Sequence, residues 1–307
     1  MRVFGQQLFL CLLCASNILA APSSFSPKKL SNLDLIGKRD VAHRSIISSE
    51  NEAAIGKLQS AQFESCVELV QDPFLQSYLA SLAEKVYLNS DYTGPIFVKI
   101  VKSSEVNSMS IPGGYIYLTS GLLSSAENED EFVGTIAHQV AHAAARHWAS
   151  EMTKASLLQF AMVSMMMVPI CPAGTTACAG LSSQQSLAQS AGLISPFGKF
   201  QRKDELEADF LGLQYVYKSG CDPRAYLALL RRATPSGAAT KQADAMSGIP
   251  PLAQRNAQAE KEINLILPNA PAPHSSPEFI QMKASLQDAL VATPPPGCEP
   301  HLRRSRQ

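Results

Sequence analysis

The sequence predicts an α+β fold that is mainly helical and contains a small β-sheet. Apolar residues recur at helical spacing over residues 50–87, and two short runs of β-branched and aromatic residues lie before residue 120. Helical periodicity returns after residue 126. The 26 acidic and 26 basic side chains give a formal net charge of zero. Composition therefore offers no electrostatic argument for a nucleic-acid partner, and we expect none.

The chain begins like an exported protein. A basic start, an apolar run from Leu8 to Leu13 and small residues up to Ala21 form the pattern of a secretory signal peptide. We expect residues 1–20 to be that signal and residues 21–49 to be a poorly ordered lead-in. Export permits disulfides, but an odd number of cysteines follows the leader, so spacing alone cannot pair them. They are Cys66, Cys171, Cys178, Cys221 and Cys298.

Two helices and two strands are expected in the first part of the chain. Asp72-Pro73 divides the first helical stretch into two helices, and Gly94-Pro95 ends the second helix. Residues 96–101 then have the composition of a strand. Pro112-Gly113-Gly114 predicts a turn that leads into another strand, Tyr115 to Thr119.

The next helix carries two histidines with metal-ligand spacing. Ser124 and Glu127 match a capping box and predict a helix from about Ala126 to Ser150. His138 and His142 lie four positions apart, so they share one face of this helix. Their imidazoles could therefore point at a single metal ion, although such a pair also occurs by chance.

A third ligand must come from elsewhere in the chain. On one continuous helix, His147 would lie about 140° round from His142, and Ala145 and Trp148 do not match the metzincin pattern. The stretch "RKDELEADFLG" offers Glu205 and Asp209, four positions apart. Glu205 would complete a His-His-Glu ligand set, and Asp209 would accept the free N–H of a ligand histidine. A solvated helix face without metal stays open as an alternative.

The second half of the chain is expected to be helical with loose connections. The apolar run Leu157–Ile170 predicts a buried helix or one that makes peripheral contact with a membrane. Residues 171–199 have the composition of a flexible connection. Gly220 would end the helix that follows. The expected helices are Lys203–Lys218, Tyr226–Arg232, Arg255–Ile266 and Pro277–Leu290, the last in a Pro-rich C-terminal extension over residues 267–307.

Several blocks together resemble the HtpX/CAAX-prenyl-protease-type zinc metallopeptidases, in particular their exported, BepA-like branch. The resemblance covers roughly Asn32 to Ile266, and several blocks in one order are more specific than any single motif. The blocks are "IGKRD", "EVNSMSIPGGYIYLTSGLL", "AHQVAHAAARH", "RKDELEADFLG", "GCDP" and "PPLAQR".

The resemblance implies a zincin-like metallopeptidase domain over residues 50–266, with a small β-sheet whose edge strand flanks the active-site helix. It implies one Zn²⁺ per chain, bound by His138, His142 and Glu205, with Asp209 behind a ligand histidine. It also implies that a polypeptide substrate or client pairs with the strand after the Pro-Gly-Gly turn. The residues of that expected edge strand are Gly114, Tyr115, Ile116 and Tyr117.

Two positions depart from the family pattern. Gln139 stands where the family has its catalytic glutamate, and a downstream histidine of the family is missing at Gly248-Ile249-Pro250. Arg255 is kept and is a further active-site candidate. Glu207 is two positions from Glu205 and should point away from the ligand set.

The resulting expectation is a zinc metalloendopeptidase for extended or misfolded envelope proteins. Its hydrolysis would be weak or lost, because the neutral amide of Gln139 cannot accept and return a proton. The alternative is a non-catalytic zinc-binding protein, chaperone-like or regulatory, that captures peptide segments along the same strand. Export and resemblance place either protein in the periplasm or cell envelope.

Overall fold

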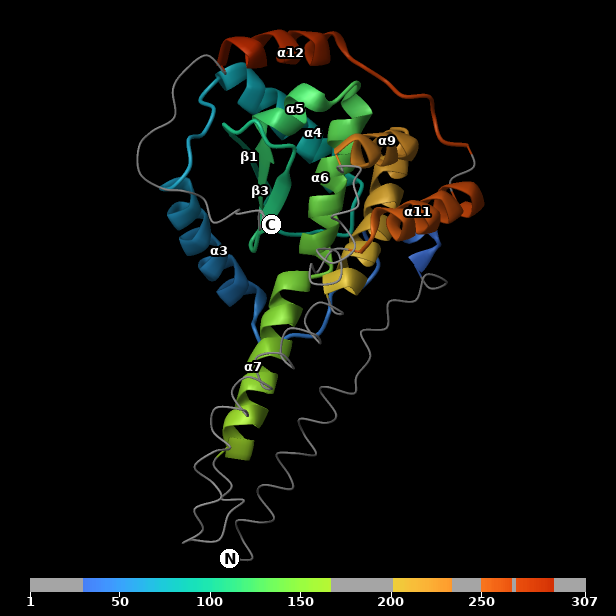
Figure 1. Cartoon of the computed structure of the whole chain (residues 1–307). Helices are drawn as coiled ribbons and strands as arrows, with labels where there is room; N and C mark the ends of the chain where they lie inside the picture. Colours follow the sequence, from blue (N-terminus) through green and yellow to red (C-terminus); the bar gives the residue numbers. More distant parts are fainter. Residues whose placement is uncertain (1–29, 167–200, 234–249, 267–268, 290–307) are drawn as a thin grey trace, which may run out of the picture.

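The computed structural model describes residues 30–166, 201–233, 250–266 and 269–289. A three-stranded sheet lies among packed helices, and helix α6 runs through the middle of the molecule (Figure 1). The mainly helical α+β class that the sequence predicts is confirmed.

The first two long helices form as the sequence predicts. They are α3 (Ser49–Glu64) and α4 (Pro73–Leu88), separated at Asp72-Pro73. The Asp72 side chain accepts a hydrogen bond from the Leu75 N–H and so caps α4. The buried face of α4 supplies a large part of the main apolar core through Leu75, Leu79, Leu82 and Val86.

The sheet contains the two expected strands and one that the sequence pattern did not reveal. Strand β1 (Phe97–Val101) pairs in parallel with β3 (Tyr115–Thr119), and β2 (Ser108–Ile111) pairs antiparallel with β3. The turn between β2 and β3 needs glycine, since Gly113 and Gly114 have φ values of 81° and 86°. Four residues with two serines give no clear strand pattern, so β2 was missed.

This extra strand corrects the expected substrate edge. The strand order is β1-β3-β2, so β3 lies in the centre and is paired on both sides. Among the described residues, β2 pairs with β3 alone, and β2 packs against α6. The strand that flanks α6 at the edge of the sheet is therefore β2. The expectation was wrong for all four residues it named: Gly114, Tyr115, Ile116 and Tyr117.

The histidine-bearing helix is shorter than expected at both ends. After the short α5 (Ser120–Ser125), α6 (Glu129–Ala144) begins at Asn128, whose side chain accepts the Glu131 N–H. The predicted capping box at Ser124 was therefore four positions early. At the other end Arg146 has a φ of 54° and separates α6 from α7 (His147–Met166). A predicted single helix to Ser150 is thus two helices.

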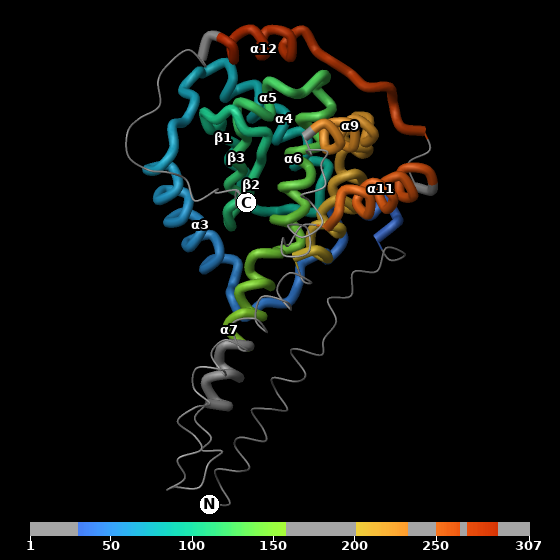
Figure 2. Tube along the Cα trace, viewed as in Figure 1, coloured from blue at the N-terminus to red at the C-terminus, as the bar shows by residue number. Residues whose placement is uncertain are grey.

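The later helices pack back onto these elements. A helix over residues 201–218, here called the Glu205 helix, is followed by Gly220, whose φ of 74° suits the residue after a helix. Then come α9 (Pro223–Ala233), α11 (Leu252–Ile266) and α12 (Pro277–Ala289). Helix α9 packs on α6, and α12 lies against α4 and α5 although it is far from them in sequence (Figure 2).

Two segments that the sequence placed outside the domain contribute to its core. Ile36 and Val41 of the lead-in are buried in the main core, so the expectation of poor order was wrong for residues 30–48. At the other end, α12 buries Phe279, Met282 and Leu286 in the same core. The core therefore extends beyond residues 50–266 in both directions.

Several expectations lie outside what the structure describes. They are the signal peptide over residues 1–20, the connection over residues 171–199, the residues Cys171, Cys178 and Cys298, and the side chains of residues 158–170. Within the described part, Cys66 and Cys221 carry free thiols. No described helix has the length and apolar character that crossing a membrane requires.

Candidate metal centre

Helix α6 brings His138 and His142 to one point. Their Nε2 atoms lie 3.1 Å apart, and the two rings are nearly perpendicular, with centroids 4.7 Å apart. This is the result of four-residue spacing on a helix. The side chain of His138 is 8% exposed and that of His142 is 17% exposed. Both rings are thus held by the core, while their two Nε2 atoms face a common space.

The Glu205 helix supplies the third side chain. Glu205 Oε2 lies 3.5 Å from His138 Nε2, and Glu205 Oε1 lies 3.4 Å from His142 Nε2. The two helices approach closely because Gly212 faces the α6 backbone. A Cβ at Gly212 would lie 3.1 Å from the backbone nitrogen of His138, closer than such contacts usually are. Burial disfavours a charged Glu205, but the two histidines outweigh it and lower the pKa of the carboxyl well below its usual value.

The donor atoms fit a zinc ion. Ligand bonds of about 2.0–2.1 Å in a tetrahedral site place the ligand atoms about 3.4 Å apart, and the observed separations are 3.1 to 3.5 Å. Two histidines and one glutamate are a ligand set of catalytic zinc sites that keep a fourth position open. The Glu205 side chain is 22% exposed, so the centre has an open side.

The other ring nitrogen of His138 faces a buried carboxylate. Asp209 Oδ1 lies 3.0 Å from His138 Nδ1, an ion-pair contact rather than a straight hydrogen bond. Arg255 donates two hydrogen bonds of 2.7 and 2.6 Å to Asp209, and the Tyr226 hydroxyl adds a third. Burial would raise the pKa of Asp209, but the charge and hydrogen bonds of Arg255, together with His138, hold it at about 2. The structure thus brings Asp209 and Arg255 to the centre where the sequence expected them.

The other ring nitrogen of His142 faces a residue that the sequence analysis excluded. His147 Nδ1 lies 2.9 Å from His142 Nδ1. The exclusion assumed one continuous helix, but the left-handed turn at Arg146 redirects the chain. Two contacts of the Arg146 guanidinium hold this turn: Glu52 Oε2 at 2.8 Å and Ile47 O at 2.7 Å. His147 still does not join the first ligand set, but it contacts that set directly.

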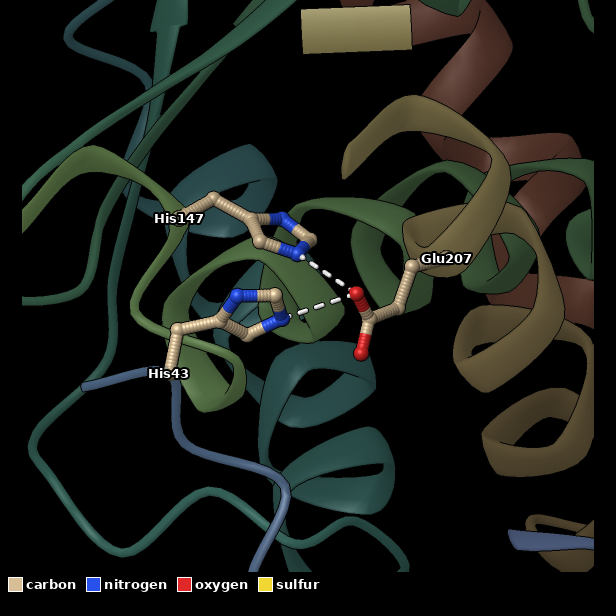
Figure 3. Close-up of side chains that lie close together, drawn as sticks. All are labelled: His43, His147 and Glu207. Atoms are coloured by element: carbon tan, nitrogen blue, oxygen red, sulfur yellow. Dashed lines mark hydrogen bonds and ion pairs between the residues drawn. The ribbon is translucent and has the colours of Figure 1, made fainter. Parts of the chain in front are cut away.

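A second group of possible ligands lies behind the first. His43, His147 and Glu207 form a buried cluster, with Glu207 Oε2 at 2.8 Å from His43 Nε2 and 3.5 Å from His147 Nε2 (Figure 3). Burial lowers the pKa of His147 to about 3. Burial alone would raise the pKa of Glu207, but hydrogen bonds from both histidines hold it at about 2. Sequence spacing could not reveal this cluster, because His43 lies 164 positions before Glu207.

Gln139 lies between the metal centre and the sheet. Its Nε2 donates a 2.9 Å hydrogen bond to Ser108 Oγ on β2, and the residue is 6% exposed. The side chain at this position is therefore neutral, nearly buried and tied to the outer strand of the sheet.

This chain is similar to a family of peptidases, to bacterial proteases and to a mitochondrial metalloendopeptidase. The sequence pattern described as "Peptidase family M48" matches residues 71–263. The beta-barrel assembly-enhancing protease of Yersinia pestis is 28% identical over 198 residues, which are 62% of this chain and 39% of that protein. The protein of the same name from Escherichia coli K12 is 27% identical over 215 residues, 67% of this chain and 42% of that protein.

A mitochondrial relative is similar over a shorter stretch. The mitochondrial metalloendopeptidase OMA1 of Arabidopsis thaliana is 31% identical over 127 residues, 41% of this chain and 23% of that protein. This chain spans about two fifths of the length of the bacterial relatives that it matches. The similarity therefore covers less than half of each of these relatives.

Proposed function

Because this chain belongs to peptidase family M48, we propose that His138, His142 and Glu205 bind one zinc ion per chain. Peptidases of this family are zinc-dependent. The proposal is supported by the donor set and by separations of 3.1 to 3.5 Å among its atoms. Asp209 orients the His138 ring from behind, as carboxylates do for zinc-bound histidines.

The substrate class that we propose is an extended or misfolded polypeptide that pairs with β2. An outer strand offers unpaired N–H and C=O groups to another extended chain. Strand β2 packs on α6, and Ser108 of β2 bonds to Gln139, the neighbour of His138. A segment paired with β2 would therefore pass beside the ligand set. The names of the bacterial relatives, which are proteases that enhance beta-barrel assembly, favour clients of the bacterial envelope.

Hydrolysis by this centre is expected to be weak or absent. Bound zinc polarises a peptide carbonyl and lowers the pKa of a water molecule. The protein must still accept a proton and return it to the leaving amine, which is work for a carboxylate or an imidazole. Gln139 is an amide and can do neither near neutral pH. The presence of an amide at this position, with its Nε2 bonded to Ser108, is the single observation that carries this part of the proposal.

Two further carboxylates near the centre, among the residues that the structure describes, are already engaged by other side chains. Glu207 contacts His43 and His147 on the far side of His142. Asp209 is enclosed by Arg255, Tyr226 and the His138 ring. Neither carboxylate is free to carry the proton from water to the leaving amine, which Gln139 cannot do. This favours the second candidate function, capture of peptide segments without cleavage, in a chaperone-like or regulatory role.

Replacing Gln139 with glutamate separates these two functions. We expect Gln139→Glu to raise kcat/KM for unfolded casein by about 10²–10⁴, the usual contribution of general acid–base catalysis. Each protein would be loaded with zinc and assayed at equal concentration. The double variant His138→Ala/Gln139→Glu is the control, because it restores the carboxylate but removes a zinc ligand.

Each result assigns a function. A gain in Gln139→Glu that the double variant abolishes means that the peptidase machinery is intact except for its proton carrier. Strong cleavage by the unmodified chain would contradict the expectation of weak hydrolysis. Equal casein binding with no cleavage by either protein, although both hold zinc, would support capture alone.

A further inference from the structure

The cluster of His43, His147 and Glu207 has the composition of a second metal site. Three segments bring its members together: the lead-in, the start of α7 and the Glu205 helix (Figure 3). The three side chains are 6%, 4% and 4% exposed, respectively. A buried group of two imidazoles and a carboxylate needs an explanation, because burying such groups is costly unless each has a partner. Metal binding is one explanation and hydrogen bonding is another.

One contact joins this cluster to the proposed zinc ligands. His142 presents Nε2 to His138 and Glu205, and its Nδ1 lies 2.9 Å from His147 Nδ1. At this distance one of the two Nδ1 atoms carries a hydrogen and donates it, while the other accepts. The position of that single proton decides which of the two clusters can bind a metal ion.

The first cluster requires the proton on His142. A neutral imidazole has one N–H and one lone pair. If Nε2 of His142 is a ligand, its Nδ1 carries the hydrogen and donates it to His147. The lone pair of His147 is then on Nδ1, so its own hydrogen is on Nε2 and points towards Glu207 Oε2 at 3.5 Å. In that state His147 cannot bind a metal through Nε2.

The converse also holds, so the two clusters exclude each other. A metal ion on His147 Nε2 would put the hydrogen on its Nδ1, and His142 Nε2 would then carry a proton in place of a metal ion. Filling both clusters would place two Nδ1–H groups only 2.9 Å apart and lose the hydrogen bond between them, or would require one of the two rings to be an imidazolate anion. With both rings neutral and joined by this hydrogen bond, the two clusters can therefore hold one ion between them.

His43 provides an independent reason why that ion belongs to the first cluster. A histidine that binds metal through one nitrogen almost always donates its other N–H to an acceptor. Among the described residues, the buried His43 Nδ1 has neither a hydrogen-bond partner nor an ion-pair contact, whereas His138 Nδ1, which also lacks a straight hydrogen bond, lies 3.0 Å from Asp209 Oδ1. As a metal ligand, His43 would bury an unsatisfied N–H. As a donor through Nε2 to Glu207, it leaves only a lone pair unmatched, which is less costly.

We propose that His43, His147 and Glu207 are positioning residues, which hold His142 in the tautomer that leaves its Nε2 free for zinc. Glu207 enforces this arrangement, because a lone pair on His147 Nε2 would face the carboxylate oxygens. The inference rests on the proposed zinc site, and it assigns a role to three residues outside the ligand set. In this arrangement the second cluster binds no metal.

One of the three residues is supplied by a segment outside the family match. Residues 41–47, called the strap, cross the junction of α6 and α7. The backbone N–H of His43 donates a 2.9 Å hydrogen bond to the backbone carbonyl of Ala145. The Ser45 Oγ lies 2.8 Å from Thr153 Oγ1. The family pattern begins at residue 71, so the strap lies outside the matched residues and yet supports the metal centre from behind.

Zinc affinity of the full chain tests the proposal. Zinc content would be measured by elemental analysis and Kd by competition with a chelator. We expect one zinc per unmodified chain, and about 10–100-fold weaker binding in His147→Leu and in Glu207→Gln, the usual effect of losing an outer partner of a ligand. His147→Asn should bind closer to the unmodified chain, since its side-chain oxygen can accept the His142 N–H. Glu262→Gln changes another buried carboxyl, away from the cluster, and should bind zinc normally.

Imidazole tautomers provide the readout that a purely structural role would not change. Nitrogen-15 NMR of the histidine rings should show the hydrogen of His142 on Nδ1 and that of His147 on Nε2. We expect this in the metal-free protein too, because Glu207 is present in both states. Circular dichroism on every variant checks that it folds.

Three results would overturn the proposal. They are a second zinc ion that Glu207→Gln removes, unchanged affinity in a folded His147→Leu variant, and a His147 hydrogen on Nδ1. Absence of zinc from the unmodified chain would instead contradict the proposed zinc site. The tautomers of the metal-free protein would then still decide whether Glu207 and His147 orient His142.

Discussion

The molecule contains two clusters of the same composition, two histidines and one glutamate, and they differ in access and in proton positions. In the first, formed by His138, His142 and Glu205, the side chains are 8–22% exposed and three donor atoms face one another. In the second, Glu207 Oε2 lies 2.8 Å from His43 Nε2 and 3.5 Å from His147 Nε2, and no side chain is more than 6% exposed. One hydrogen bond between His142 and His147 links them.

This difference teaches that ligand types alone do not define a metal site. The two nitrogens of a ligand histidine have different roles, because one must offer a lone pair and the other must find an acceptor. His138 Nδ1 lies 3.0 Å from the Asp209 carboxylate in an ion-pair contact, and His142 Nδ1 lies 2.9 Å from His147 Nδ1. In the described structure, His43 has no such contact at Nδ1. The second cluster therefore resembles a support for the first more than a duplicate of it.

Removing one histidine from each cluster gives the largest expected contrast. His138→Ala should reduce zinc content after mild dialysis from one ion per chain to almost none, because it deletes a ligand. His43→Ala, loaded and dialysed in the same way, should keep most of its zinc, since its nitrogen contacts the Glu207 carboxylate and not the ion. Elemental analysis of both proteins measures this. Equal loss from both variants would erase the distinction between the clusters.

The next largest expected effect is a loss of stability when Arg255, which holds Asp209 behind the first cluster, is replaced. Arg255→Met should lower the free energy of unfolding by about 3–5 kcal/mol, the usual cost of leaving a buried charge without its partner. The uncompensated group would be Asp209, which is fully enclosed and receives two bonds from Arg255. Urea denaturation of the metal-free protein measures this effect. A matched exposed cation, Arg231→Met, should change stability by less than about 1 kcal/mol.

Another buried carboxyl, that of Glu262, contrasts with Glu207 in how it makes the stability of the protein depend on pH. Two histidines hold the pKa of Glu207 at about 2, whereas burial raises that of Glu262 to about 8, and the hydrogen-bond donor to Glu262 among the described residues is the amide of Gln214. Between about pH 4.5 and 8 the unfolded chain loses the Glu262 proton while the folded protein keeps it. Stability should therefore fall as pH rises through this window.

Glu262→Gln removes this pH-dependent fall in stability, because an amide has no proton to release. Urea denaturation at pH 5 and pH 8 should show a smaller decrease for Glu262→Gln than for the unmodified chain. Glu84→Gln changes an exposed carboxyl of α4 and serves as the control. Parallel pH profiles for the unmodified chain and Glu262→Gln would show that Glu262 keeps its charge in the folded state.

Local sequence patterns were sufficient for the parts that depend on neighbours along the chain. Helical periodicity, Asp72-Pro73 and Gly220 predicted helices that the structure contains. Spacing of four placed His138 beside His142, and it set Glu205 and Asp209 on one helix face. The resemblance of several blocks then connected these distant segments. In each case a short stretch determines geometry, because a helix repeats every 3.6 residues.

Only the tertiary structure decided how the segments complete one another. A left-handed turn at Arg146, held by the lead-in and α3, brings His147 back towards His142, where a straight helix would have carried it away. Strand β2 exists because β3 and α6 support four residues with little strand character. His43 meets Glu207 across 164 positions. Such contacts depend on the packing of the whole chain, and no local pattern encodes them.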